Sequence, residues 1–421
     1  MCTDPIKGFV GSLGYGTRFF SQKDFDWAIY KYLTPYLIFE TMPSYDYIII
    51  GAGAAGLLLA DALGKDNFFA SKSILVLDKD DKSRNDRTWC FWERGKGEYD
   101  ELIHKTWDSI YVGGQKLQKS TSIAPYTYKM LRGIDFYNHF LSKVKAYPNI
   151  TWAQEEVQHI EEQENEVLVT TSSQEYLGQT VFSSLYDPSL PLKQSKHPVL
   201  QQHFVGWQIK TEQSVFNSKE ATFMDFSVEQ KGNTRFMYVL PQSNTEALVE
   251  YTLFSEHLLE KREYEEAIKK YIATNLGNTP YTIEETEFGS IPMTCYPFHQ
   301  HNTNRIFNIG IAGGWAKPST GYTFYNTSRQ IPKLVEHLKT GKPLTEFNQK
   351  SRFLFYDMLL LDILYENNHL GHEIFESMFK RRKASLILKF LENETNLWEE
   401  LRIVTAPKPM PFIKALFKRL F

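Results

Sequence analysis

The pattern of apolar and polar residues near the start of the chain predicts a strand, a tight turn, a helix and a second strand. Residues 45–50 form an almost unbroken apolar run, which is typical of a strand buried in a parallel sheet. Glycines follow in the spacing G-x-G-x-x-G at residues 51–56, and residues 57–63 read as a helix. A second apolar run, residues 74–77, completes a strand–helix–strand unit and leads directly to Asp78.

These elements in this order are typical of a site for a dinucleotide cofactor. Gly51 permits a tight turn, Gly53 lets backbone N–H groups approach a pyrophosphate, and Gly56 lets the helix pack closely on the strand. Asp78 lies about 20 residues beyond the glycines, where an acid accepts hydrogen bonds from ribose hydroxyls. The alternative is a glycine-rich turn that binds no ligand. The residues expected to contact the cofactor here are Gly51, Gly53, Ala54, Ala55, Gly56, Asp78 and Lys79.

The middle of the chain alternates between apolar and polar residues and predicts an antiparallel sheet. Residues 235–240 and 247–253 read as strands joined by a polar turn at residues 242–246, and residues 260–272 read as a helix. We therefore expect an α/β fold, in which an antiparallel sheet domain is inserted into a Rossmann-like nucleotide domain and a helical region ends the chain. The expected segments are an N-terminal extension of uncertain role at 1–41, the two parts of the nucleotide domain at 42–185 and 295–345, the substrate domain at 186–294, and the helical C-terminal region at 346–421.

A second glycine-rich segment lies far along the chain, after a strand-like run at residues 305–307 and before a helix-like segment at residues 328–331. NAD-binding folds seldom need a second such segment, whereas FAD is extended and contacts a distant loop near its flavin half. A structural turn is the alternative, because glycine and proline interrupt loops of every kind. The residues expected to contact FAD in this segment are Gly310, Gly313, Gly314, Pro318, Thr320 and Gly321.

Composition excludes several classes of protein. With 42% hydrophobic and 23% charged residues, the chain is typical of a globular protein with a sizeable core. The formal net charge of -3 argues against a nucleic-acid partner, because nucleic-acid binding requires a large basic surface. Cys2, Cys90 and Cys295 form no C-x-x-C pair, so neither a metal site nor a disulfide framework is predicted, and a reducing cytoplasm fits. No apolar run reaches the ~20 residues of a membrane-spanning helix, and residues 1–41 make a poor signal peptide.

Several separated motifs carry a resemblance to one family. They are Gly51 to Gly56, Asp86-Arg-Thr-Trp-Cys-Phe-Trp92, Met224-Asp225, Leu248-Val-Glu-Tyr-Thr252, Ile291-Pro-Met293 and Ala312 to Tyr322. Together and in this order they resemble the lycopene cyclases, flavoproteins that close the ends of carotenoid chains. The resemblance runs from about residue 42 into the C-terminal region. It implies a fold like the flavin monooxygenases, bound FAD, and conversion of linear lycopene to β-carotene.

The cyclisation that this resemblance implies is an isomerisation, with no net gain or loss of electrons. Reduced flavin, with NAD(P)H as the implied reductant, must then assist without being consumed. The protein must supply an acid for a terminal double bond, a base for the ring proton, and a dry aromatic tunnel that shields a carbocation from water. Two alternatives remain: a flavin monooxygenase for an apolar substrate would consume NAD(P)H and oxygen, and a flavin or lipid carrier would show no turnover.

Glu250 is the residue expected to handle the proton. In the strand at residues 247–253 it shares a face with Leu248 and Thr252, and burial among apolar groups would raise its pKa and keep it protonated at neutral pH. The equivalent stretch of the lycopene cyclases usually carries two adjacent acids, the first regarded as catalytic. Here the second position is Tyr251, which leaves the acid role to Glu250 and puts a mechanism with two carboxylates in doubt. The alternative is a strand glutamate that faces solvent.

Two further charged residues are candidates for the site. Asp225 stands in an apolar setting and is expected as a second catalytic residue, the alternative being an aspartate at a turn or strand end. Arg87 follows the second strand closely enough to bind a cofactor phosphate through two of its N–H groups. The alternative for Arg87 is a surface salt bridge, which contributes little to stability.

The end of the chain predicts contact with a membrane, from which a long hydrocarbon substrate would have to be taken. On a helix over residues 411–421 the apolar residues share one face and the basic residues lie away from it, as in helices that lie in a membrane interface. Basic residues at 380–383 would add attraction to anionic lipid, about 1 kcal/mol each. The expected location is cytoplasmic, at the inner face of the membrane, and the alternative is an amphipathic helix docked on the protein core. The apolar residues are Phe412, Ile413, Leu416, Phe417 and Leu420.

Overall fold

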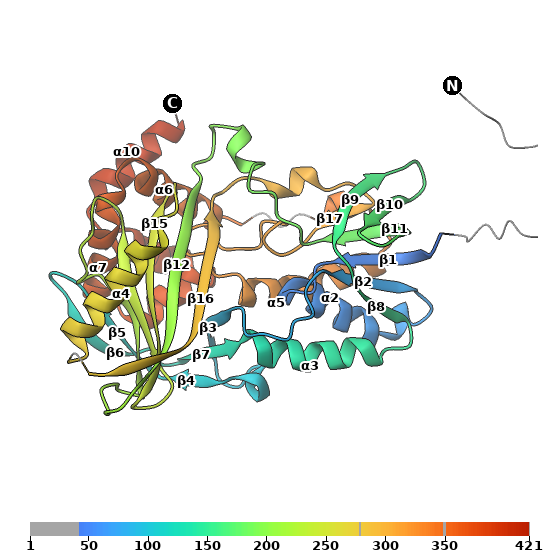
Figure 1. The fold of residues 1–421 in the computed structure, drawn as a ribbon. Coiled ribbons are helices and arrows are strands. Elements are labelled where there is room, and N and C mark those ends of the chain that lie inside the picture. Colours follow the sequence, from blue (N-terminus) through green and yellow to red (C-terminus); the bar gives the residue numbers. More distant parts are fainter. Residues whose placement is uncertain (1–41, 278, 348–350, 421) are drawn as a thin grey trace, which may run out of the picture. The chain divides into compact units, whose positions relative to one another are not determined.

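The computed structural model describes residues 42–277, 279–347 and 351–420. The extension expected at residues 1–41 lies outside the described residues. Within the compact unit Ser44–Phe421, three sheets and a series of helices follow one another (Figure 1).

A mostly parallel sheet carries the nucleotide part of the fold. Its strands lie in the order β8-β2-β1-β11-β10-β9, with β17 paired to β11. The pairs of β1 with β2 and β11, of β2 with β8 and of β11 with β17 are parallel, and β9, β10 and β11 form an antiparallel meander. The bounds are β1 (Ser44–Ile50), β2 (Ile74–Asp78), β8 (Ile150–Gln154), β9 (Val157–Glu162), β10 (Val167–Thr171), β11 (Glu175–Ser183) and β17 (Ile306–Asn308).

Both faces of this sheet are covered, which explains the unbroken apolar runs in its sequence. On one face, Ile49 and Val76 pack against the helices α2 (Ala54–Lys65), α3 (Gly133–Ala146) and α5 (Phe324–Lys339). On the other face, side chains such as Ile48 and Leu75 pack against residues of β10 and β11. The predicted strand–helix–strand unit is confirmed as β1, α2 and β2.

A second sheet is almost entirely antiparallel and has the order β16-β12-β15-β14-β13-β5-β6. The predicted hairpin is confirmed, since β14 pairs antiparallel with β15, and the predicted helix is α4 (Lys261–Asn275). β5 and β6 come from residues 109–122, within the segment 42–185 that the sequence analysis assigns to the nucleotide domain; the proposed division of the chain into five segments remains a prediction. The bounds are β5 (Ser109–Gly113), β6 (Gln118–Ser122), β12 (Leu200–Thr211), β13 (Glu220–Asp225), β14 (Arg235–Pro241), β15 (Glu246–Ser255) and β16 (Tyr281–Met293).

The two faces of the second sheet differ in what covers them. Val249 and Tyr251 of β15 pack against α4, whereas Leu248 and Phe254 belong to a core shared with the C-terminal helices. A small third sheet links the two larger ones and is formed by β3 (Thr88–Arg94), β4 (Lys105–Trp107) and β7 (Tyr126–Arg132).

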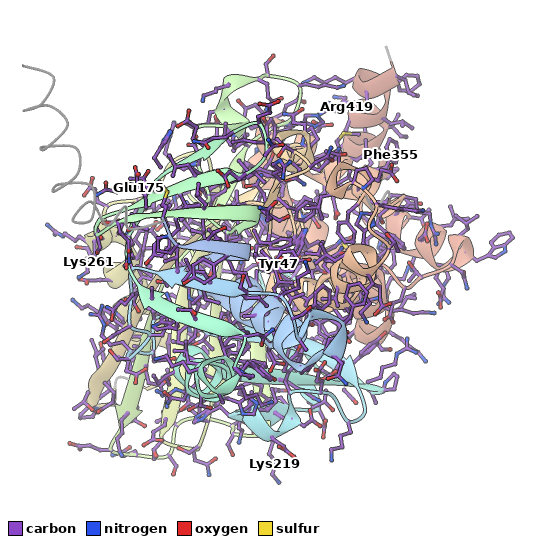
Figure 2. All side chains as sticks on the ribbon, turned by 90° about the vertical axis from the view of Figure 1, so that its right-hand side faces the viewer. Tyr47, Glu175, Lys219, Lys261, Phe355 and Arg419 are labelled. Atoms are coloured by element: carbon purple, nitrogen blue, oxygen red, sulfur yellow. The ribbon has the colours of Figure 1, made fainter. Side chains whose placement is uncertain are left out.

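The C-terminal region is helical, as predicted. Its helices are α6 (Phe353–Glu366), α7 (Gly371–Arg381), α8 (Ala384–Leu391), α9 (Leu397–Val404) and α10 (Pro409–Leu420). Two acids interrupt the apolar sequence of α6 and each has a buried or half-buried cation: Asp357 pairs with Lys317 at 3.0 Å, and Asp362 with Arg419 at 2.6 Å. Figure 2 shows Arg419 on α10 above Phe355 of α6. In residues 42–277, 279–347 and 351–420, no helix is long and apolar enough to cross a membrane.

Candidate active site

The first glycine-rich segment forms a tight turn that leads into α2. Gly51 has a φ of +93°, a conformation that L side chains rarely adopt. A Cβ on Gly56 would lie 1.8 Å from the carbonyl oxygen of Gly51, so only glycine lets α2 pack this closely on the turn. Gly53 is the N-cap of α2 and makes no side-chain cap, so the first N–H groups of the helix remain available to an anionic ligand.

The two glycine-rich segments meet in space although they are far apart in sequence. β17 pairs with β11 and so brings the second segment beside the first. A Cβ on Gly310 would lie 3.1 Å from the Cβ of Ala55, which shows how closely the two segments approach. The sequence predicted two contacts with one cofactor, and the fold places both segments where one ligand can reach them.

Both segments border a cavity of about 610 Å³. Cofactor and drug-sized ligands usually occupy cavities of about 300–1,000 Å³. Its wall is strongly aromatic, with Trp89, Tyr128, Tyr186, Phe204, Tyr238, Phe288, Tyr322 and Phe324. The predicted site residues that line it are Gly53, Ala54, Ala55, Arg87, Glu250, Gly310, Thr320 and Gly321.

Buried polar atoms in this lining test whether a cofactor fits. The side-chain oxygens of Tyr186, Gln202, Thr320 and Thr327 are buried without a hydrogen-bond partner. An unpaired buried polar atom costs about 1–3 kcal/mol, so these atoms indicate a ligand with polar groups of its own. Together with the N-terminus of α2, which suits phosphates, this set of residues fits FAD.

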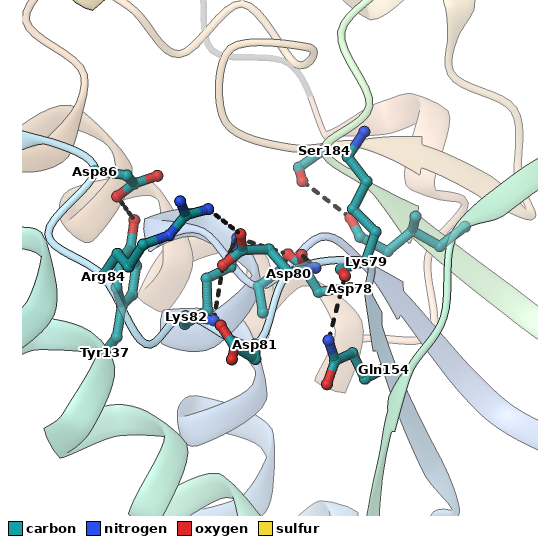
Figure 3. Close-up of polar contacts among 12 residues, drawn as sticks. Asp78, Lys79, Asp80, Asp81, Lys82, Arg84, Asp86, Tyr137, Gln154 and Ser184 are labelled. Atoms are coloured by element: carbon teal, nitrogen blue, oxygen red, sulfur yellow. Dashed lines mark hydrogen bonds and ion pairs between the residues drawn. The ribbon is translucent and has the colours of Figure 1, made fainter. Parts of the chain in front are cut away.

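Asp78 and Lys79 lie at the end of β2 but are not among the described residues that line the cavity. Asp78 accepts hydrogen bonds from the backbone N–H groups of Ala52 at 2.6 Å and Asp80 at 2.8 Å, so it braces the glycine-rich turn (Figure 3). Lys79 is exposed and pairs with Glu156 at 3.1 Å. Cofactor contacts for these two residues remain predictions.

The remaining residues of the second segment shape its loop. A Cβ on Gly313 would lie 2.3 Å from the carbonyl oxygen of Asn308, and Gly314 has a φ of +72°. Pro318 stands between Lys317 and Ser319, which both bind the carboxylate of Asp357. Among the described residues that line the cavity, Gly313, Gly314 and Pro318 are absent, so the predicted contacts of these three residues with FAD are untested.

Arg87 lies at the cavity in an ion pair with Asp86 at 2.6 Å. The side chain of Arg87 is half exposed, and Asp86 also accepts a hydrogen bond from Tyr137 at 2.8 Å. The salt bridge named as the alternative for Arg87 is therefore present, and a contact of Arg87 with a cofactor phosphate remains a prediction.

Glu250 points into the cavity from β15, as the alternation of the strand predicts. Its residue is 8% exposed, and its carboxylate accepts a hydrogen bond from Thr252 at 2.5 Å on the same face. Burial raises the pKa of Glu250 well above its ordinary value, and the nearby carboxyl group of Glu287 raises it further. The buried position of Glu250 agrees with the predicted acid in an apolar wall. It does not agree with the alternative, a glutamate that faces solvent.

A second carboxyl group, which the sequence analysis missed, faces Glu250. Glu287 of β16 and Glu250 of β15 both stand opposite Gly206 of the intervening strand β12, and their carboxyl groups are hydrogen-bonded. Burial raises the pKa of Glu287, while Thr88 donates to its carboxylate at 2.9 Å. The charged run around Glu287 reads as a solvent-facing strand, and no local pattern in the sequence distinguishes it.

Tyr251, which replaces the second acid of the resembled motif, points away from the cavity. Its hydroxyl group accepts a hydrogen bond from Arg235 at 3.1 Å, and its ring packs against Tyr264 of α4. Adjacent residues of a strand face opposite sides of the sheet, so an acid at this position would not reach Glu250 directly. The pair of carboxyl groups is supplied by β16 instead.

Asp225 is buried, but it lies on the side of α4. Its carboxylate accepts hydrogen bonds from the hydroxyl group of Tyr271 at 2.8 Å and from the backbone of Ser227 at 2.9 Å. Asp225 is absent from the described residues that line the cavity. The structure thus does not bring Asp225 and Glu250 together, and the catalytic role predicted for Asp225 has no support in this arrangement.

The fold and the site together define the class of the protein as a flavoprotein-like α/β enzyme fold. The chain is similar to a flavoprotein/dehydrogenase from Cytophaga hutchinsonii, with a TM-score of 0.60, 14% identity, and coverage of 90% of this chain and 99% of the other. It is also similar to a geranylgeranyl bacteriochlorophyll reductase-like protein from Thermoplasma acidophilum, with a TM-score of 0.55, 12% identity, and coverage of 89% and 96%. A third similar structure is p-nitrophenol 4-monooxygenase PnpA from Pseudomonas putida DLL-E4, with a TM-score of 0.53, 13% identity, and coverage of 90% and 98%.

The family follows from the sequence. The family described as lycopene cyclase protein matches residues 46–417, most of the chain, so the chain belongs to the lycopene cyclase family. No curated protein matches it. The predicted family and the predicted flavin monooxygenase-like fold are both confirmed.

Proposed function

We propose that this protein is a lycopene β-cyclase that converts the ends of lycopene into the rings of β-carotene by acid–base chemistry. One observation carries the proposal: the carboxyl group of Glu250 and the N-terminus of α2 open into the same aromatic cavity. The cavity therefore contains both a proton donor and a helix N-terminus that can bind the phosphates of a flavin cofactor. Membership of the lycopene cyclase family supports the choice of substrate.

The chain's own residues account for the proton chemistry. Because burial raises the pKa of Glu250, its carboxyl group keeps its proton to a higher pH than an exposed glutamate does, and it can deliver that proton to a terminal double bond. The cation that forms would be quenched by water, and the aromatic wall excludes water and offers cation–π contact. Tyr238 and Tyr322 line the cavity, and each interacts electrostatically with Glu250.

FAD is the cofactor we propose, with NAD(P)H as its reductant. Gly53, Ala54 and Ala55 would hold its phosphates at the start of α2, and Gly310, Thr320 and Gly321 would border its other half. Reduced flavin would supply an electron-rich group beside the substrate and would not be consumed, because cyclisation transfers no net electrons.

Peripheral attachment to the inner face of the membrane is also proposed. In α10, Ala415 is buried and Phe412 and Leu416 pack on the core, while Ile413 and Leu420 are 41% and 64% exposed. The predicted face is therefore divided between core and surface. Replacing Ile413 and Leu420 by serine should weaken binding to vesicles that contain anionic lipid in a sedimentation assay, and undiminished binding would remove α10 from the membrane proposal.

Expression in a host that accumulates lycopene tests the activity. Pigment chromatography should show β-carotene with the wild-type chain and lycopene with Glu250→Gln. Glu246→Gln is the matched control, because Glu246 lies on the same strand but is only partly buried and is paired with Lys210 at 2.9 Å. An unchanged pigment profile with folded, flavin-loaded wild-type protein would refute the proposal. Consumption of oxygen and NAD(P)H in proportion to product would indicate a monooxygenase instead.

A further inference from the structure

Glu287 stands between two cavities of different character. One is the large aromatic cavity, and the other is a small polar cavity of about 60 Å³. Among the residues that the structure describes, three line both cavities, namely Thr88, Leu248 and Glu287. Of these three, only Glu287 carries a group that titrates near neutral pH, so it is the one ionisable side chain that both cavities share.

The small cavity is suited to water. Its other lining residues are Asn85, Met130, Arg132, Gln208, Gln242, Glu285 and Thr286. A water molecule needs roughly 10–15 Å³ of such space and two to four polar partners, so this cavity has room for several. Glu285 and Thr286 are exposed, which connects the small cavity to solvent.

The contacts of Glu285 hold the polar wall in place. Arg132 pairs with its carboxylate at 3.0 Å, and Asn85 donates to the other oxygen at 2.9 Å. On the opposite side, the amide groups of Gln208 and Gln242 exchange hydrogen bonds at 3.1 and 2.7 Å. Polar groups thus surround the small cavity, whereas mainly aromatic and aliphatic groups surround the substrate side of Glu250.

The absence of a side chain at Gly206 lets the two carboxyl groups meet. A Cβ at this position would lie 3.0 Å from the Cγ atom of Glu287 and 3.0 Å from a methyl group of Leu248. Gly206 is paired with Glu250 on one side and with Glu287 on the other. The contact therefore crosses the central strand through a gap that only glycine leaves open.

We propose that Glu287 exchanges protons between the small polar cavity and Glu250, and so connects the acid of the dry cavity to solvent. This inference rests on the proposed cyclisation. In that reaction the double bond takes one proton from Glu250, and the ring cation later returns one proton to solvent, so no net proton is consumed. After Glu250 has given its proton, the ionised carboxyl group of Glu287 takes up a proton from water in the small cavity and passes it to Glu250. Glu287 acts through Glu250 and does not touch the substrate.

Several charged or titratable groups face the carboxyl pair. Burial raises the pKa of Glu287 most, hydrogen bonds with Thr88 and Glu250 lower it, and the charges of Glu285 and Asp86 raise it. The groups that face the pair from the surrounding elements are Asp86, Cys90, Arg132, Tyr238, Glu285 and Tyr322. Replacing Glu287 by glutamine should lower the pKa of Glu250, because the negative charge of Glu287 repels the ionised form of Glu250 and so keeps it protonated.

Glu287→Gln tests the inference by two measurements on the full chain. Without substrate, infrared difference spectra against Glu250→Gln report the protonated carboxyl group of Glu250, and its titration midpoint should move to lower pH. With lycopene in lipid vesicles, kcat should fall about 10²-fold, the lower end of what a positioned acid or base contributes, with KM unchanged. Glu284→Gln is the control, because Glu284 is an exposed glutamate of the same strand.

Each outcome decides a separate point. If Glu287→Gln behaves like Glu284→Gln in both measurements, the inference is wrong. If the midpoint moves but kcat stays at the wild-type value, the carboxyl pair exists but proton exchange through Glu287 is refuted. If the wild-type chain does not cyclise lycopene and the midpoint still moves, the proposed function fails while the pair survives. Gln208→Leu, which keeps both carboxyl groups but makes the small cavity less polar, should also lower kcat, and an unchanged kcat would refute the route through that cavity.

Discussion

Each face of the large antiparallel sheet carries a buried acid, and the two acids differ in their hydrogen-bond partners. On the side of α4, Asp225 accepts hydrogen bonds from Tyr271 and Ser227, so both of its oxygens have a donor. On the cavity side, Glu250 has one hydroxyl donor, Thr252, and faces a second carboxyl group. Burial alone therefore does not identify a proton donor. Glu250 differs from Asp225 because it has fewer hydrogen-bond donors and because a second carboxyl group, that of Glu287, lies beside it. Both differences favour the protonated form of Glu250.

The largest expected effect separates the two acids directly. Glu250→Gln should lower the rate of cyclisation by about 10²–10⁴-fold, the range that a positioned general acid contributes. Asp225→Asn should keep most of the activity, since Asp225 is remote from the cavity lining. Initial rates with lycopene in lipid vesicles, normalised to bound flavin, measure both. An equal loss of activity in a folded, flavin-loaded Asp225→Asn protein would overturn the comparison.

A smaller effect on the cavity side is expected from Gly206→Ala. The new methyl group would lie 3.0 Å from the Cγ atom of Glu287 and from Leu248, so the side chain of Glu287 must shift by a few tenths of an ångström. Misplacing a reacting group by about 1 Å can cost up to about 10²-fold in rate, and the loss here should not exceed that. Gly232→Ala controls for loss of a glycine, since its Cβ would meet nothing within 4 Å, although its φ of +85° adds strain. A rate unchanged by Gly206→Ala would show that the carboxyl contact is unimportant.

On the side of α4, Tyr271→Phe should affect stability and not activity. Removing the hydroxyl group leaves one oxygen of buried Asp225 without its donor, which costs about 1–3 kcal/mol of unfolding free energy. Urea denaturation followed by fluorescence measures the loss, and the cyclisation rate at low temperature should match the wild type. A stable variant with a large loss of rate would place Tyr271 in the reaction.

The smallest effect is the pH dependence of stability that Glu250 contributes. The pKa of Glu250 is raised in the fold above its ordinary 4.5, so between these two values the folded chain binds more protons than the unfolded chain. The unfolding free energy should then fall by up to about 1.4 kcal/mol for each unit that the pH rises through this range.

Comparison with Glu250→Gln isolates this contribution. The variant cannot titrate at this position, so its unfolding free energy should fall less steeply, and the difference between the two proteins should grow as the pH rises above 4.5. Buried acids outside the pair of Glu250 and Glu287, such as Glu392, whose pKa is raised to about 7 chiefly by burial, contribute equally to both proteins and cancel. A difference that is constant with pH would contradict a raised pKa at Glu250.

Local sequence patterns sufficed for one half of the site and failed for the other. The glycine spacing predicted the turn and the start of α2, and the period of two in β15 predicted that Glu250 and Thr252 share a face. The sequence did not identify Glu287 as a site residue, because its neighbours in β16 are charged or exposed and the segment has the pattern of a strand that faces solvent. Its position depends on the pairing of β12 with both β15 and β16, which no local pattern records.

For Asp225 the local sequence pattern suggested a site residue, but the fold places this residue outside the cavity lining. An acid in an apolar run is a reasonable candidate, but the residue that holds it, Tyr271, comes from a helix far along the chain. The recruitment of β5 and β6 into the large sheet is similarly a matter of distant pairing. Such long-range partners decide whether a buried charge is structural or reactive, and a single sequence does not contain them.

The ion pair of Lys317 with Asp357 has a consequence for how the protein is made. The loop that follows the second glycine-rich segment is bound to α6 by two hydrogen bonds. Lys317 and Ser319 both donate to the carboxylate of Asp357. During synthesis the loop emerges before α6 does, with its ammonium group still lacking its permanent counterion. This loop, which also carries the cavity residues Thr320 and Gly321, is therefore fixed only after α6 has been synthesised, and chains that end before α6 should bind less flavin and be less yellow.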